Sequence, residues 1–131
     1  KIARLLEGDP GLDVFGGLGG ASALGELRRG ACGTMTGFAF PEVLRAVRLA
    51  AESDDWAAAA GVFDRYLPLI QFEAQPGVGL AIRKEVLRRR EVLASARARL
   101  AAALDRRSAD ELDDVLTRVG ITPGPDPLEV T

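Results

Sequence analysis

Two short units of the same kind lie near the start of the chain, and each reads as a buried strand, a glycine-rich turn and a helix. The first unit places a strand at about residues 13–15, a turn at 16–20 and a helix at 21–29. The second places a strand at about residues 33–36 and starts a helix at Pro41, where a missing amide hydrogen costs nothing. Strands separated by helices pair in parallel through crossovers. The order therefore predicts an α/β fold with ligands bound at the carboxyl ends of the strands, beside the glycine turns.

Beyond the second strand, the spacing of apolar residues predicts helices alone. The helix from Pro41 ends near residue 52 and carries charges at three- and four-residue spacing, which form ion pairs along one side: Glu42, Arg45, Arg48 and Glu52. A second helix follows the capping residues 53–55 and has one apolar stripe: Trp56, Ala60, Phe63, Leu67 and Ile70. Pro68 should end or kink this helix.

The last third of the chain contains two further helical segments. Residues 79–90 read as one helix, and Ser108 with Glu111 matches a capping box at the start of another. Residues 94–104 are expected to be half helical, because alanine and leucine favour a helix while the arginines leave little apolar stripe. The tail, residues 122–131, holds three prolines and is expected to be poorly ordered.

Composition narrows the class of protein. A length of 131 residues permits one domain, and a net charge of -2 with a pI near 5.2 argues against a nucleic-acid binder. The arginine triplet at residues 88–90 reads as a solvated helix face. No apolar run reaches the length of a membrane span and no leader is present, so a cytoplasmic protein without a membrane partner is expected. The chain starts inside a helix without methionine, which indicates a fragment.

The residue types exclude several kinds of chemistry. Histidine is absent, which removes Ser-His-Asp triads and histidine-based zinc sites, and neither a metal nor a cofactor is predicted. Cys32 is interpreted as a buried, inert thiol, and Asp13 as structural. The glycine turn lacks the third glycine of a dinucleotide fingerprint. Of the two lysines, Lys1 and Lys84, the second lies on a charged helix and reads as a solvated or ion-paired residue.

Six segments, taken in order, resemble the dihydrodipicolinate synthase and N-acetylneuraminate lyase family. They are VFGG (14–17), ELRRGACGTMTG (26–37), PE (41–42), DWAAA (55–59), LPL (67–69) and RKEVL (83–87). Members of this family are (β/α)8 TIM barrels with extra C-terminal helices, and they form an imine between a lysine and pyruvate or a related 2-keto acid. The amino-acid sequence of the glycine turn and of residues 33–42 resembles the sugar-acid dehydratase branches, such as 2-keto-3-deoxyarabonate dehydratase, more than the lysine-biosynthetic synthases.

The resemblance implies that the chain is the C-terminal part of such a barrel. Residues 1–52 would supply the last two β/α units with strands 7 and 8, residues 53–121 a C-terminal helical appendage, and residues 122–131 a flexible tail. The family's imine lysine lies on strand 6, so no catalytic residue is expected in this chain, and the fragment alone would be inactive. Gly16 and Gly17 would lie near the bound keto acid, and the Met35 backbone carbonyl would face the lysine. The family habit implies a homo-oligomer, a dimer or a tetramer.

A different class of function stays open at this point. Two parallel strands alone cannot bury both of their faces, so an isolated chain should expose a large apolar patch. Such a patch fits a fragment of the lyase. It also fits a non-catalytic helical module that binds another protein.

Overall fold

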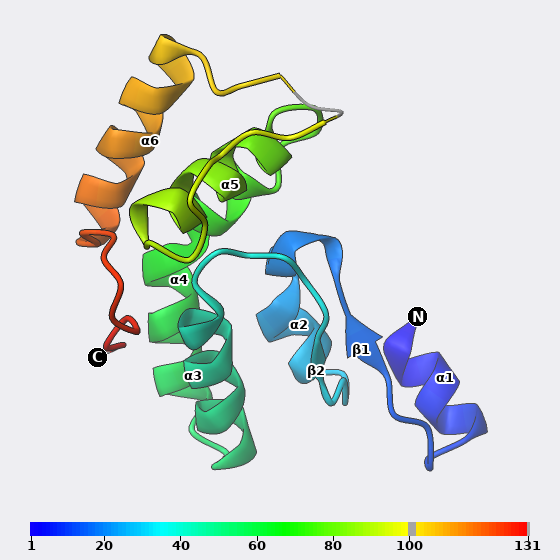
Figure 1. The fold of residues 1–131 in the computed structure, drawn as a ribbon. Coiled ribbons are helices and arrows are strands. Elements are labelled where there is room, and N and C mark those ends of the chain that lie inside the picture. Colours follow the sequence, from blue (N-terminus) through cyan, green and yellow to red (C-terminus); the bar gives the residue numbers. More distant parts are fainter. Residues whose placement is uncertain (100–101, 131) are drawn as a thin grey trace.

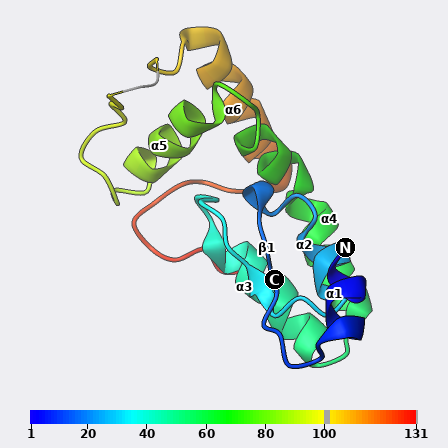
Figure 2. The same ribbon diagram turned by 90° about the vertical axis from the view of Figure 1, so that its right-hand side faces the viewer.

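The computed structural model describes residues 1–99 and 102–130, and Figure 1 shows their arrangement. The elements, in chain order, are α1 (Ile2–Gly8), β1 (Phe15–Gly16), the 3₁₀ helix η1 (Leu18–Gly20), α2 (Ala23–Leu27), β2 (Gly33–Thr34), α3 (Pro41–Glu52), α4 (Trp56–Glu73), α5 (Gly79–Arg89) and α6 (Arg106–Val119). In both views the small sheet and α1 lie at the end of the molecule away from α5 and α6 (Figures 1 and 2). In this described part of the chain, no helix is both long and apolar enough to cross a membrane.

The two strands pair in parallel, as the sequence predicts. Phe15 lies opposite Gly33 and Gly16 opposite Thr34. Two further hydrogen bonds extend the pairing, since the Cys32 amide donates to the Val14 carbonyl at 2.8 Å and the Met35 amide donates to the Gly16 carbonyl at 2.9 Å. Each strand is only two residues long, shorter than predicted, because the glycine turn leads the chain out of β1 and the segment after β2 turns toward α3.

The core forms mainly between α3 and α4, which lie side by side in both views and pack extensively on each other (Figures 1 and 2). Its fully buried side chains come from α3 to α6: Val43, Val47, Ala59, Leu69, Ile70, Ile82, Val86 and Leu112. Helix α4 runs through Pro68 to Glu73, so Pro68 does not end the helix, which is one of the two outcomes that the sequence predicts. Both Pro68 and Asp64, whose carbonyl lacks the usual amide partner, are exposed. Water can therefore satisfy that carbonyl.

The start of α6 also differs from the prediction. The helix begins at Arg106, and the Asp105 carboxylate caps it by accepting a hydrogen bond from the Ser108 amide at 2.9 Å. Ser108 is therefore inside the first turn and is not the cap. The expected half-helical stretch is wrong where it is described, since residues 94–99 and 102–104 contain no helix. Residues 100 and 101 of that stretch lie outside the described part.

The tail contacts the body of the protein, although the sequence predicts a poorly ordered end. Ile121 is buried, and the side chains of Leu128 and Val130 pack against the core. The Leu128 amide donates a hydrogen bond to Glu42 of α3 at 3.3 Å. Figure 1 shows this red segment continuing beyond the end of α6, beside α4.

Candidate functional site

The three residues predicted to line a pocket, Gly16, Gly17 and Met35, lie together at the carboxyl ends of the two strands. The Met35 amide binds the Gly16 carbonyl. A β-carbon placed on Gly17 would lie 3.5 Å from the Met35 carbonyl oxygen, so the side-chain direction of Gly17 faces that carbonyl. The parallel pairing therefore brings the glycine turn and Met35 to one end of the sheet, the end at which parallel sheets bind ligands.

Part of this small sheet is open to solvent. Phe15 is 55% exposed, and Met35, two residues beyond Gly33, is 78% exposed. Gly16 instead lies against α2, because a β-carbon placed there would clash with the Glu26 carboxylate. Parallel sheets are normally covered on both faces. Helices cover one side of this sheet, and two large apolar side chains remain uncovered.

Leu18 belongs to the same end of the sheet, and the sequence analysis did not single it out. It lies in the glycine turn, is 93% exposed and has a backbone φ of 50°. A residue with a β-carbon in this left-handed region costs about 1 kcal/mol. The sequence does contain a signal for Leu18: it is an apolar residue with two glycines on each side, and such a turn keeps its side chain away from any core.

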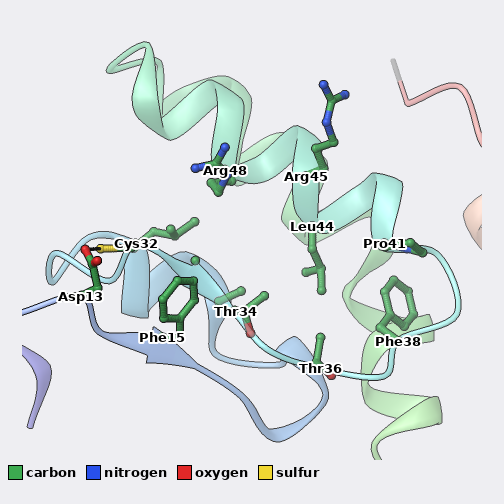
Figure 3. A pocket seen from close by; sticks show the side chains of 13 residues that line it. Asp13, Phe15, Cys32, Thr34, Thr36, Phe38, Pro41, Leu44, Arg45 and Arg48 are labelled. Carbon is green, nitrogen blue, oxygen red and sulfur yellow. Dashed lines mark hydrogen bonds between the residues drawn. The ribbon is translucent and has the colours of Figure 1, made fainter.

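A hollow of about 550 Å³ lies beside β2, between the strands and helices α2 and α3 (Figure 3). Phe38 and Leu44 point toward this space, whereas the Arg45 side chain extends away from the strands. The Thr34 and Thr36 hydroxyl oxygens are buried and have no hydrogen-bond partner among the described residues. Buried groups of this kind cost free energy until they find a partner.

Cys32 lies at the rim of this hollow and is exposed, so the prediction of a buried thiol is wrong. Its neighbours Ala31 and Gly33 are buried, and the alternation of side chains along extended backbone turns Cys32 the other way. The Cys32 thiol donates a hydrogen bond to the Asp13 carboxylate at 3.3 Å (Figure 3). Asp13 precedes β1 and thus lies at the end of the sheet opposite to Met35.

A buried carboxylate that the sequence analysis missed binds the segment between β2 and α3. Glu73, the last residue of α4, is 2% exposed. Its Oε2 accepts a hydrogen bond from the Ala39 amide at 3.1 Å and lies 3.4 Å from Arg83 Nε on α5. Burial raises the pKa of Glu73 to about 7, against the opposite effects of Ala39 and Arg83. The available signal was its position three residues after the buried Ile70, on the apolar side of the helix.

Arg90 corrects two predictions about charges. Arg90 is 7% exposed, so it is not part of the solvated helix face predicted for residues 88–90. It forms an ion pair with Glu42, which the sequence predicts to pair with other residues of α3. Arg90 donates to both oxygens of Glu42 and to the Ala39 carbonyl, and its guanidinium lies 4.7 Å from the centre of the Phe40 ring. Burial alone would raise the pKa of Glu42, but the Arg90 hydrogen bond and charge, with backbone donors, hold that pKa below its usual value. The two arginines before Arg90 pair with Glu85, as a charged helix face should.

Neither lysine lines the glycine turn or the hollow. Lys84 is half-buried on α5 and donates a hydrogen bond to the Arg97 backbone carbonyl. Within residues 1–99 and 102–130, no group of three or more His, Cys, Asp or Glu side chains is placed to hold a metal ion. The described site can therefore bind and orient a ligand through backbone groups and apolar surface, but it presents no amine for covalent catalysis.

These features define a class of protein. A parallel strand pair joined by a crossover helix, with a glycine turn at the carboxyl ends and helices packed behind, belongs to the α/β proteins. Among solved structures, the chain is similar to the crystal structure of dihydrodipicolinate synthase from Rhodopseudomonas palustris, with a TM-score of 0.83 and 36% sequence identity. The match confirms the resemblance that the sequence motifs indicated: over 89% of its length, the chain is similar to a member of the dihydrodipicolinate synthase family.

The extent of the match is unequal for the two proteins. It covers 89% of this chain but 41% of the synthase, so the chain spans less than half of the length of that protein. No family model and no curated protein matches the chain.

Proposed function

We propose that this chain forms the last two β/α units and the C-terminal helical region of a (β/α)8 barrel, a lyase that forms an imine with pyruvate or a related 2-keto acid. In this proposal β1 and β2 are strands 7 and 8, and residues 1–52 form the barrel units. Residues 53–121 form the helical appendage and residues 122–131 the tail. The structural match to dihydrodipicolinate synthase supports the assignment.

The observation that carries the proposal is the contact of the glycine turn with Met35 at the carboxyl ends of parallel strands. The open sheet adds support, because Phe15 and Met35 are exposed and a hollow runs beside β2. In a closed barrel, earlier strands would pair with the free edges of β1 and β2 and cover these apolar side chains. A complete barrel needs on the order of 250 residues, which is consistent with the partial coverage of the synthase.

The proposed roles are those of a pocket wall. Gly16 and Gly17 lie near the bound keto acid, and the Met35 carbonyl faces the reactive amine. The lysine that forms the imine belongs to an earlier strand, so these 131 residues alone are inactive. The protonated imine withdraws electrons and permits aldol condensation, aldol cleavage or loss of water, without a metal or other cofactor.

Trapping the imine tests the proposal. The protein in its full natural length is incubated with pyruvate and reduced with borohydride, and the modified peptide is located by mass spectrometry. We expect an adduct on a lysine outside these 131 residues, and the same yield from the Lys84→Arg variant. Absence of any adduct, or an adduct on Lys84, would show that the proposal is wrong.

Two finer features belong to the same proposal. By resemblance to the family we propose a cytoplasmic homo-oligomer, a dimer or tetramer, which sedimentation of the intact protein would test. The amino-acid sequence of the glycine turn and of residues 33–42 favours the 2-keto-3-deoxy sugar acid dehydratases within the family. Loss of water from such an acid, measured beside aldol cleavage, distinguishes the branches.

The second candidate is a helical module that binds another protein. The exposure of Leu18 and Met35, at 93% and 78%, favours it, because both are large apolar side chains at one end of the sheet. The reading frame before Lys1 separates the candidates. Further strand and helix units with a strand lysine support the lyase, whereas a start codon directly upstream supports the module.

A further inference from the structure

Side chains of the helical region bind the backbone of the segment that joins β2 to α3. Glu73 at the end of α4 accepts a hydrogen bond from the Ala39 amide, and Arg90 after α5 donates to the Ala39 carbonyl. The Arg83 guanidinium lies against Gly37, where a β-carbon would come within 2.7 Å of its Nη1. Side chains from distant parts of the chain thus bind both backbone polar groups of Ala39, four residues after Met35.

We propose that Glu73 is a positioning residue, which fixes the segment between Met35 and Phe40 by binding Ala39 and Arg83 and so sets the place of the Met35 carbonyl. The importance of that carbonyl rests on the function proposed above. The positioning of the segment by Glu73 does not rest on that function, because it concerns only contacts within this chain. Gly37 supports the assignment, since any larger residue there would push Arg83 away from Glu73.

The equilibrium between the closed segment, bound to Glu73, and an opened segment depends on the protonation of Glu73. In the closed segment, burial keeps the pKa of Glu73 at about 7, and in an opened segment water returns the pKa toward 4.5. The closed form therefore binds the proton more tightly, and raising the pH from 4.5 to 7 favours opening. Above pH 7 the carboxyl is ionised in both forms, and the dependence ends.

The surroundings of Glu73 contain one opposing charge. Arg83 on α5 faces the carboxylate, while the joining segment contributes only the Ala39 backbone. Residues 18–20, which pack on α4 beside Ala74, carry no titratable side chain. Arg90, which is paired with Glu42, binds the Ala39 carbonyl instead. A pH response of the segment between pH 5 and pH 7 therefore reports mainly on Glu73.

Hydrogen exchange followed by mass spectrometry tests this inference on the protein in its full natural length. Deuterium uptake is measured for peptides covering residues 36–40 between pH 5 and pH 8 and corrected for the intrinsic pH dependence of exchange. We expect protection in the wild type to fall by up to about tenfold per pH unit up to pH 7 and then to level off. Glu73→Gln, which keeps an acceptor for Ala39 but cannot ionise, should show no such fall. Glu111→Gln, at an exposed position of α6, should behave as the wild type.

Equal pH dependence in the wild type and Glu73→Gln would overturn the inference, as would the same dependence in peptides of α6. Should Glu73→Gln fail to fold, Arg83→Gln takes its place. Because Arg83 lowers the pKa of Glu73, its removal should move the levelling-off to higher pH, and an unchanged profile would overturn the inference. Imine trapping is read separately. A pH-dependent segment without a pyruvate adduct refutes the proposed lyase alone, and an adduct without the pH dependence refutes the positioning role alone.

Discussion

Arg90 provides a demanding test of the structure, because the sequence predicts it to be solvated and the structure buries it. Its guanidinium binds Glu42 on α3 and the Ala39 carbonyl, and it stacks on Phe40. Arg90→Met removes the charge and the donors but keeps a chain that can cover the ring. The variant therefore isolates the polar contacts from the packing.

The expected cost is the sum of three partly overlapping effects. Leaving one partner of a buried ion pair alone costs about 3–5 kcal/mol, and the partial exposure of Glu42, 22% for its side chain, reduces that to about 2 kcal/mol. Leaving the Ala39 carbonyl without its donor adds about 1 kcal/mol, and the loss of the contact with Phe40 adds about 0.5–1 kcal/mol. We expect Arg90→Met to lower the free energy of unfolding by about 3–4 kcal/mol.

Urea unfolding at pH 7, followed by circular dichroism, measures this cost. Arg107→Met is the matched control, because its ion pair with Glu111 on α6 is exposed, and its stability should change little. A double-mutant cycle with Glu42→Gln should give a coupling free energy of about 1–3 kcal/mol. If Arg90→Met costs no more than Arg107→Met, the buried network described here is wrong.

Three further predictions concern stability and access. Global stability should fall by about 3 kcal/mol as the pH rises from 4.5 to 7, because folding raises the pKa of Glu73, and chemical denaturation of Glu73→Gln should not show this fall. Gly61→Ala, in an open position of α4, should raise the free energy of unfolding by about 1 kcal/mol. Gly79→Ala should lower it by about 1–3 kcal/mol, because its β-carbon would lie 2.3 Å from the Glu73 carbonyl oxygen. Equal denaturation midpoints for the two variants would contradict this contrast. Iodoacetamide should alkylate Cys32 in the native protein, and labelling only after unfolding would show that the thiol is buried.

Much of the fold could be predicted from the sequence, where the deciding interactions are local. The glycine turn, the proline at the start of α3 and the apolar spacing of α3 and α6 fixed the order of elements and the parallel strand pair. The family resemblance, not a local signal, pointed to Gly16, Gly17 and Met35 as site residues, and the parallel pairing places them at one end of the sheet. Local signals left the helix boundary open at Pro68, which α4 accommodates at an exposed position, and gave the wrong boundary at Asp105, which caps α6 ahead of Ser108.

Only the tertiary structure decided which charges are buried and what they hold. Glu73 and Ala39 are 34 residues apart in sequence, and Arg90 and Ala39 are 51 apart, so no periodicity or capping pattern connects them. The sequence by itself determined the order of the strands and of most helices and that the strands run parallel, because backbone preferences and helical spacing act over a few residues. The burial of Glu73 and Arg90 depends on how α4 and α5 pack behind the joining segment, and packing depends on contacts between residues that the sequence leaves far apart.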